Sequence, residues 1–124
     1  MRKKIFTSAF FILFFAAFIN AQILISEIMY NPIESEYYDE FVELYNYSDS
    51  TVDLTDWKLG DQDKLGNIVA PNDETSLLCP PHSYILILDN GYFENSTAYE
   101  GIEAQILTLD ISGIGSNGLS NSAA

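Results

Sequence analysis

The stretch EFVELYNYSDSTVDLTDWKLGD, from Glu40 to Asp61, places acids, aromatic residues and one tryptophan between two turn-forming segments. In its first part, Val42 and Leu44 stand two residues apart, so they share one face if the chain is extended. Phe41 and Tyr45 then share the opposite face. This alternation predicts a β-strand with Val42 and Leu44 in a core, while acids at the ends of the strand stay in water.

The second part, VDLTDWKLGD, does not keep that period. Three residues separate Leu54 from Trp57, which predicts a bend or bulge near Thr55 and Asp56. We interpret Trp57 as a core residue because burial of so large a ring contributes strongly to the stability of a small domain. Stacking of an exposed Trp57 on a sugar is the alternative.

Further strands are expected on both sides of this stretch. The candidate segments are QILISEIMYNP at 22–32, NIVAP at 67–71, TSLL at 75–78, SYILILDN at 83–90 and AQILTLDI at 104–111. In the first, a strict period puts Ile23, Ile25 and Met29 on one face, and Leu24 and Ile28 on the other. SYILILDN is apolar on both sides, as in a central strand that is covered on both faces.

The segment GYFENSTAYEG, at 91–101, is expected to be a loop with room for one helical turn. No segment shows a sustained helical period, and turn residues recur at short intervals. The sequence therefore predicts an all-β sandwich or barrel. Its predicted core consists of Ile25, Val42, Leu44, Leu54, Trp57, Leu59, Ile85 and Ile87.

Residues 1–21 differ from the rest of the chain. A basic head of Arg2, Lys3 and Lys4 precedes an apolar run rich in phenylalanine, and Ala21 is a small residue suited to cleavage. This pattern predicts a signal-peptide helix that is removed, leaving residues 22–124 as the mature domain, and a retained anchor is the alternative. The predicted location is outside the cell, at its surface or in the periplasm.

Loss of the leader leaves 2 of the 5 basic residues against 18 acidic ones, a net charge of −16. Such a surface repels nucleic-acid phosphates and anionic lipids, so we expect no direct nucleic-acid binding and no membrane span in the mature chain. No phosphate-binding, dinucleotide-binding or zinc-protease motif occurs. Cys79 and His82 are the only residues of their kinds, and prolines separate them, which argues against a catalytic pair and a His/Cys metal site.

The segments ISEIMYNP, EFVELYN, VDLTDWKLGD and LCPPHSYILILD follow one another in an order that resembles the lamin-tail domain, over about Ile23 to Asn121. The resemblance implies an immunoglobulin-like β-sandwich. In bacteria, the family occurs on exported and surface proteins beside enzymes or adhesion modules. GLSNS, close to Ala124, resembles the family's segment before its closing strands. We therefore expect a fragment of a longer multidomain chain, with an open sheet edge that pairs or aggregates.

The carboxylates are the remaining candidates for chemistry. Glu27 and Glu43 are expected on neighbouring strands. Others are expected to face water at turns and strand ends, where they cap backbone amides: Asp39, Glu40, Asp49, Asp53, Asp56, Asp61 and Asp63. One weak calcium site is the alternative, although DQDKLGN lacks EF-hand spacing. Hydrolysis of a sugar by paired carboxylates would need a cleft that the pattern does not indicate.

Two features of other kinds are notable. Five tyrosines surround the first loop and second strand, and we expect most of them to pack rather than to form a binding patch: Tyr30, Tyr37, Tyr38, Tyr45 and Tyr47. Asn46 and Asn95 each begin a glycosylation sequon, which matters only in a eukaryotic host.

These observations together predict a non-catalytic module without a catalytic, cofactor or metal site. It would space, anchor or present a partner domain, or bind a protein or surface. A calcium-dependent adhesion or carbohydrate-binding module is the alternative.

Overall fold

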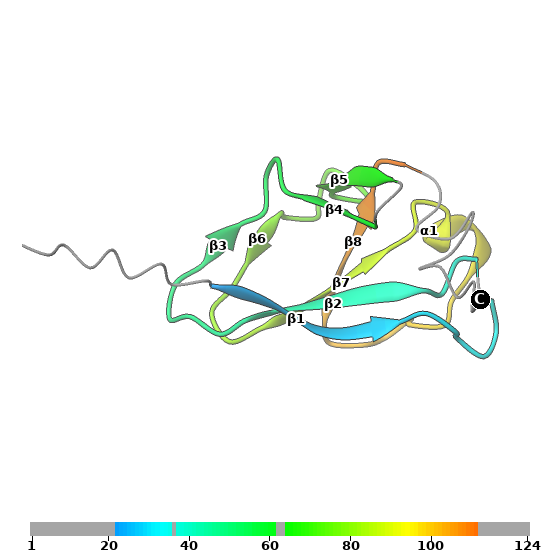
Figure 1. Cartoon of the computed structure of the whole chain (residues 1–124), viewed down its shortest axis with the longest axis horizontal. Helices are drawn as coiled ribbons and strands as arrows, with labels where there is room; N and C mark the ends of the chain where they lie inside the picture. The colour runs from blue at the N-terminus through cyan, green and yellow to red at the C-terminus, as the bar shows by residue number, and fades with distance from the viewer. Residues whose placement is uncertain (1–21, 36, 62–63, 112–124) are drawn as a thin grey trace, which may run out of the picture.

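The computed structural model describes residues 22–35, 37–61 and 64–111 (Figure 1). The predicted signal-peptide helix and the segment 112–124 lie outside the described residues. In chain order, the elements are β1 (Ile23–Met29), β2 (Phe41–Asn46), β3 (Val52–Asp53), β4 (Lys58–Gly60), β5 (Leu65–Val69), β6 (Leu78–Cys79), β7 (Tyr84–Leu88), α1 (Tyr92–Asn95) and β8 (Gln105–Leu109). The prediction of an all-β chain with one helical turn is confirmed.

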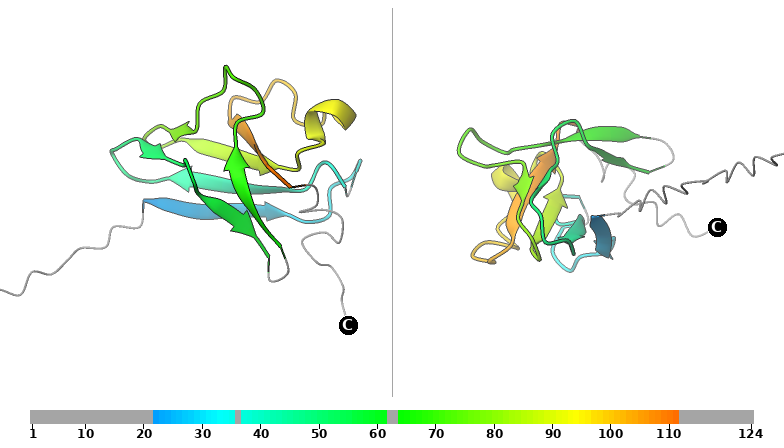
Figure 2. Two further views of the ribbon diagram at one scale, coloured as in Figure 1. Left: turned by 90° about the horizontal axis from the view of Figure 1, so that it is seen from above. Right: turned by 90° about the vertical axis from the view of Figure 1, so that its left-hand side faces the viewer.

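The strands form one curled sheet and one short pair. The larger sheet has the order β1-β2-β7-β8-β5-β4, and β3 pairs with β6. All pairs are antiparallel except β7 with β8. Figures 1 and 2 show β4 and β5 turning away from β1, β2 and β7, so that they lie with the β3–β6 pair over one face of the sheet. This covered face is called the inner face below.

The main core fills the inner side of the curl. Val42 and Leu44 of β2 lie there beside Ile85 and Ile87 of β7, because residues opposite each other in a ladder point to the same face. Leu54, which follows β3, is fully buried in the same cluster. The predicted burial of these five side chains is confirmed, and Leu59 packs against them while staying partly exposed.

A second, smaller cluster covers the outer face at one end of the sheet. Phe41, Leu86 and Leu88 pack there with Tyr92 of α1, and Tyr99 packs against them. β7 therefore contributes to both clusters and lies between β2 and β8, which confirms its prediction as a central strand covered on both faces.

The expected interruption after Leu54 is confirmed as well. The chain leaves β3 at Asp53, turns through Asp56 with a φ of +64°, and enters β4 at Lys58. Trp57 lies on this turn, and 41% of it is exposed. Its predicted place in the core is wrong, because Trp57 lies on the turn before β4, and Leu59 within β4 makes the contact with the core instead.

The predicted burial of Ile25 is also wrong. Ile25 lies opposite Leu44 and therefore faces the inner side, yet it is 56% exposed because β1 is the edge strand. The ladder with β2 is irregular between Ile25 and Glu27, where Ser26 is the extra residue of a bulge. The bulge moves Ile28 to the inner face and Met29 to the outer face, which reverses the facing that a strict period predicts.

Candidate binding surfaces

The edge strand β1 presents apolar side chains on both faces. Leu24, Ile25 and Ile28 are each about half exposed, and together they are called the β1 surface below. In the described part of the chain, β1 pairs only with β2. An edge with apolar side chains can accept a further strand or an apolar face from a partner.

Two carboxylates face each other beside this surface. Their expected places on neighbouring strands are confirmed, and Glu27 lies directly opposite Glu43 in the β1–β2 ladder. Like charges in that arrangement destabilise a sheet. The Ser26 hydroxyl group donates a 2.6 Å hydrogen bond to the Glu43 carboxylate. The bulge residue thus stabilises one of the two negative charges that repel each other.

The acids at the entry to β2 are buried, although the sequence predicts them in water. Asp39 and Glu40 are only 1% and 4% exposed. The Asp39 carboxylate accepts a bond from the Ser35 N–H through Oδ2 at 3.1 Å, and the Asp39 N–H donates to the Ser35 carbonyl at 3.0 Å. These two bonds close the loop before β2 over the Asp39 side chain. The prediction failed because a turn residue stays solvated only if no other segment covers it.

A segment distant in sequence provides that cover. The Tyr99 hydroxyl group donates a 2.6 Å hydrogen bond to the Asp39 carbonyl oxygen, and its ring makes an edge contact with Phe41 at 5.3 Å. The Tyr92 hydroxyl oxygen accepts the Tyr99 N–H at 2.8 Å. Burial and the negative charge of Asp39 raise the pKa of Tyr99 to about 12. Tyr99 thus remains a neutral donor that fastens the 91–104 loop to the start of β2.

A cavity of about 440 Å³ opens at this junction. Its wall combines apolar and polar groups and consists of Met29, Asn31, Pro32, Ile33, Glu34, Asp39, Ala98 and Tyr99. The Asp39 Oδ1 atom is buried and has no hydrogen-bond partner among the described residues. A buried carboxylate oxygen without a donor is unfavourable, so Asp39 is a residue of the cavity wall with one unsatisfied hydrogen-bond acceptor.

Asn46, at the end of β2, is a buried structural residue. Its amide nitrogen lies 2.8 to 3.0 Å from the carbonyl oxygens of Ser50, Cys79 and Pro80, and its Oδ1 accepts two bonds from Ser48. Asn46 is fully buried, so its sequon cannot be glycosylated in the folded protein. Asn95, in the second sequon, lies on the surface at the end of α1.

Cys79 and His82 have separate partners in the structure. The buried Cys79 thiol lies 3.7 Å from the Ser83 hydroxyl group, while His82 Nε2 lies 2.8 Å from Asp49 Oδ1 on the surface. The Asp49 side chain is 97% exposed, so this surface contact contributes little to stability. The geometry gives the thiol no adjacent base to activate it.

Other acids behave as the turn chemistry predicts. The Asp53 carboxylate accepts bonds from the Thr55 hydroxyl group at 2.6 Å and the Thr55 N–H at 2.9 Å, which lower its pKa. Asp61 likewise accepts the Lys64 N–H at 2.9 Å. Asp56 is exposed, and Asp63 lies outside the described residues. Within 22–35, 37–61 and 64–111, no three acidic, His or Cys side chains gather as a metal site would require. One weak calcium site stays the alternative to the prediction of no metal site.

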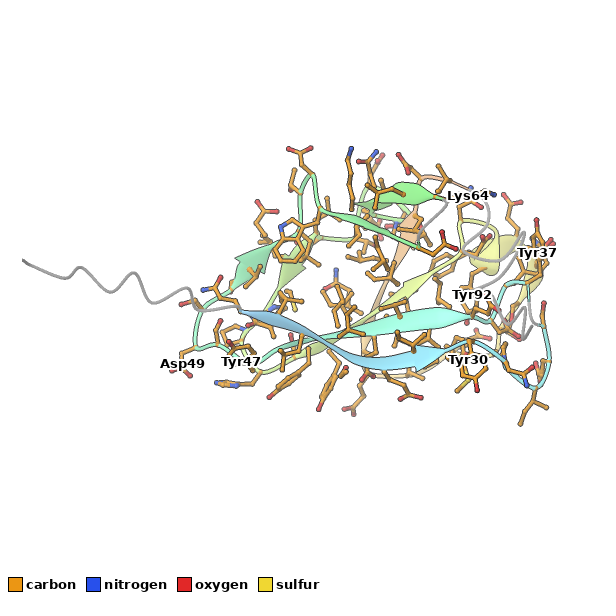
Figure 3. The ribbon with its side chains drawn as sticks, in the orientation of Figure 1. Tyr30, Tyr37, Tyr47, Asp49, Lys64 and Tyr92 are labelled. Atoms are coloured by element: carbon orange, nitrogen blue, oxygen red, sulfur yellow. The ribbon has the colours of Figure 1, made fainter. Side chains whose placement is uncertain are left out.

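The five tyrosines are spread along the molecule. Tyr45 packs on Tyr84 across β2 and β7 with ring centres 4.5 Å apart, and Tyr37 makes an edge contact with Tyr38. Figure 3 shows Tyr47 and Asp49 at one end of the molecule, and Tyr30 and Tyr37 towards the other. They do not form one aromatic binding patch.

Comparisons with known proteins bear on the whole domain. The family model described as Lamin Tail Domain matches residues 17–120. A search of curated proteins found no match, and neither did a search of solved structures. In the described part of the chain, no helix is long and apolar enough to cross a membrane. The order of its strand motifs, the curled all-β architecture and the family match over nearly its whole length show that this chain belongs to the lamin tail domain family, a family of non-enzymatic, immunoglobulin-like structural or binding domains.

Proposed function

We propose that this lamin tail domain is an exported, non-catalytic module that binds a protein partner through the β1 surface and so spaces, anchors or presents a neighbouring domain. The exposed apolar edge of β1 carries the proposal. Leu24, Ile25 and Ile28 are about half exposed along one edge strand, and a group of exposed apolar side chains is typical of a binding surface.

The β1 surface offers two kinds of stabilisation to a partner. The first is burial of apolar area, worth roughly 25 cal/mol per Å². The second is addition of a strand, because backbone groups on the free side of an edge strand can extend the ladder. The bulge at Ser26 interrupts that ladder, so a partner strand would have to match its register. The proposed interaction is therefore selective for a partner strand of matching register and differs from nonspecific apolar association.

Export is supported by the basic head, the apolar run and the small residue at Ala21. The net charge of −16 in residues 22–124 suits a domain that stays soluble outside the cell or at its surface. Mass spectrometry of the protein recovered from its host tests this part of the proposal. A mature chain that begins at Gln22 in the exported fraction is expected, and a full-length chain in the cytosol would contradict it.

Site-specific photo-crosslinking tests the binding surface. A photoreactive amino acid replaces Ile25 in protein produced in its own host, and a matched variant carries it at Leu65, which is 61% exposed on β5. We expect one predominant adduct from position 25 that is absent at position 65. Equal labelling at both positions, or none at position 25, would contradict the proposal. Adducts between two copies of the chain would identify the partner as the chain itself.

Trp57 supports a second candidate, a carbohydrate-binding module. Its ring is 41% exposed on the turn between β3 and β4, and an exposed indole can stack on a sugar. Because the chain has one tryptophan, indole fluorescence reports on this position alone. A saturable change in Trp57 fluorescence with an oligosaccharide would favour this candidate over a protein partner, provided that isothermal titration calorimetry shows the binding in wild type and its loss in Trp57→Leu.

A further inference from the structure

We infer that the cavity beside Asp39 is a receptor for a lysine side chain of a partner protein, whose ammonium group pairs with the buried carboxylate. This inference rests on the proposed binding function and names the chemistry of one partner group. It concerns a site separate from the inner-face residues Ile25 and Ile28, because Met29, which lines the cavity, lies on the outer face opposite Phe41.

The Asp39 carboxylate defines what the cavity can bind. One oxygen is already an acceptor for the Ser35 N–H, and Oδ1 is buried without a partner. The ligand must therefore bring a hydrogen-bond donor to a single oxygen. An ammonium group is a compact point charge that can do so, whereas a guanidinium group is best matched to a carboxylate with both oxygens free.

The walls of the cavity suit the remainder of a lysine. Met29, Pro32, Ile33 and Tyr99 line the cavity together with Asp39, and Ile33 is fully exposed at its rim. The four-carbon stem of lysine commonly packs along such surfaces while its head group reaches a charge. A volume of about 440 Å³ lies in the range of small-ligand sites and leaves room for the flanking backbone of a partner peptide.

The local charge also favours a cation. Glu34 lines the cavity, and the charges of Asp39, Glu27 and Glu34 all act on the Tyr99 hydroxyl group and help to raise the pKa of Tyr99. No basic side chain is part of the cavity wall. A positive group entering here is attracted by several carboxylates, and the partly buried position reduces screening by salt.

The occupant is not expected to come from the described part of the chain. Between residues 22 and 111, the sequence contains two basic residues, Lys58 in β4 and Lys64 after it, and neither lines this cavity. A bare metal ion fits poorly, because calcium takes six to eight oxygen ligands and no three acidic, His or Cys side chains gather around a common point in the described residues. A lysine on another protein meets both requirements.

NMR titration of the ¹⁵N-labelled protein tests the inference. The probe is Nα-acetyl-lysine-N-methylamide at physiological salt, and the matched control is the norleucine analogue, which keeps most of the stem but lacks the ammonium group. We expect saturable shifts of the Ser35, Asp39 and Tyr99 amide signals with the lysine probe alone. Equal shifts with norleucine, or no saturable response to lysine, would overturn the inference.

Substitutions locate the response. Asp39→Asn retains an acceptor for Ser35 but removes the charge, and we expect it to weaken binding by about tenfold or more, the effect of losing a charge-assisted bond. Because Asp39 is buried, Glu34→Gln serves as a second variant on an exposed side chain, with a smaller loss expected. Asp73→Asn, on an exposed loop, removes the same charge elsewhere and should change nothing.

The remaining outcomes are also decisive. Equal weakening by Asp73→Asn and Glu34→Gln would show general attraction to an acidic surface and overturn the inference. Displacement of the lysine probe by calcium at matched ionic strength would assign the cavity to a metal ion and overturn it as well. If position 25 crosslinks to a partner but the lysine probe does not bind, the proposed function stands and only this inference fails.

Discussion

Single residues in this protein take their roles from the segments that cover them. Asn46 and Asn95 illustrate this, because both stand in the same sequon pattern. Asn46 is fully buried and donates hydrogen bonds to the carbonyl groups of Ser50 and Cys79, while Asn95 is exposed and donates one bond to the carbonyl group of Gly91, just before α1. The same sequon pattern thus places a buried structural residue at Asn46 and a surface residue at Asn95.

Replacement of Asn46 by alanine should destabilise the domain by about 3 kcal/mol, because several buried carbonyl groups lose their donor. The matched change Asn95→Ala should alter the free energy of unfolding by less than about 0.5 kcal/mol. Urea unfolding followed by Trp57 fluorescence measures both. Similar losses for the two variants would show that burial of Asn46 does not decide its contribution.

Tyr99 makes the stability of the domain depend on pH in the alkaline range. Its pKa is raised from 10.0 to about 12, so the folded state holds this proton more tightly than the unfolded state. The contribution is complete below pH 10 and falls as pH rises towards 12. The stability advantage of wild type over Tyr99→Phe should therefore shrink across this range, as measured by urea unfolding at several pH values. An advantage that is constant with pH would contradict the shift.

At the scale of elements, the bulge in β1 has the largest consequence. Ser26 changes which side chains of β1 face inward, so that Ile25 and Ile28 share the inner face and Met29 reaches the outer cluster. A bulge also twists an edge strand and makes it a poor template for uncontrolled pairing. β1 therefore remains available to a matched partner without acting as a flat, regular edge.

Deletion of Ser26 tests this role. The residues on either side already pair with consecutive residues of β2, so the shortened strand should keep its register and facing. We expect a folded domain with a free energy of unfolding within about 1–2 kcal/mol of wild type, after loss of the Ser26 bonds to Glu43. Self-association measured by sedimentation velocity should increase, and Ser26→Ala should not show that increase. A shortened protein that stays monomeric would argue against protection by the bulge.

Prediction from the sequence was most successful for features that depend on residues close together in the chain, such as the positions of strands and turns. The period of two located β2 and β7, and the irregular spacing after Leu54 located the turn at Asp56. The facing of β1 was predicted wrongly beyond Ile25, because SEIM shows no local signal for a bulge. Pairing with β2 decides where the extra residue is accommodated.

At the scale of the whole molecule, charge dominates the surface. Residues 22–124 carry a net charge of −16, and repulsion among these groups opposes the compact state. Exposed carboxylates such as Asp53 and Asp61 are used in turns and are not gathered into a described metal site. The acidic residues therefore act mainly through their summed negative charge, and the Asp39 cavity is one place where carboxylates lie beside apolar side chains.

The melting temperature should accordingly rise by a few degrees between low and physiological salt, because added ions screen the repulsion. Calcium at the same ionic strength should raise the melting temperature no more than sodium chloride does, if screening of charge repulsion is the cause. Differential scanning fluorimetry with calcium, with sodium chloride and with a chelator measures this. An additional rise with calcium would instead support the calcium-dependent adhesion alternative.

The amino-acid pattern was enough to predict the alternation of Val42 and Leu44, the turn chemistry of Asp53 and the family to which the chain belongs. These depend on adjacent residues or on a pattern along the whole chain. The burial of Asp39 and the exposure of Ile25 follow from the folded arrangement and could not be predicted from the pattern. Alternation fixes the face to which a side chain points, but whether another segment covers that face depends on contacts between residues far apart in the chain.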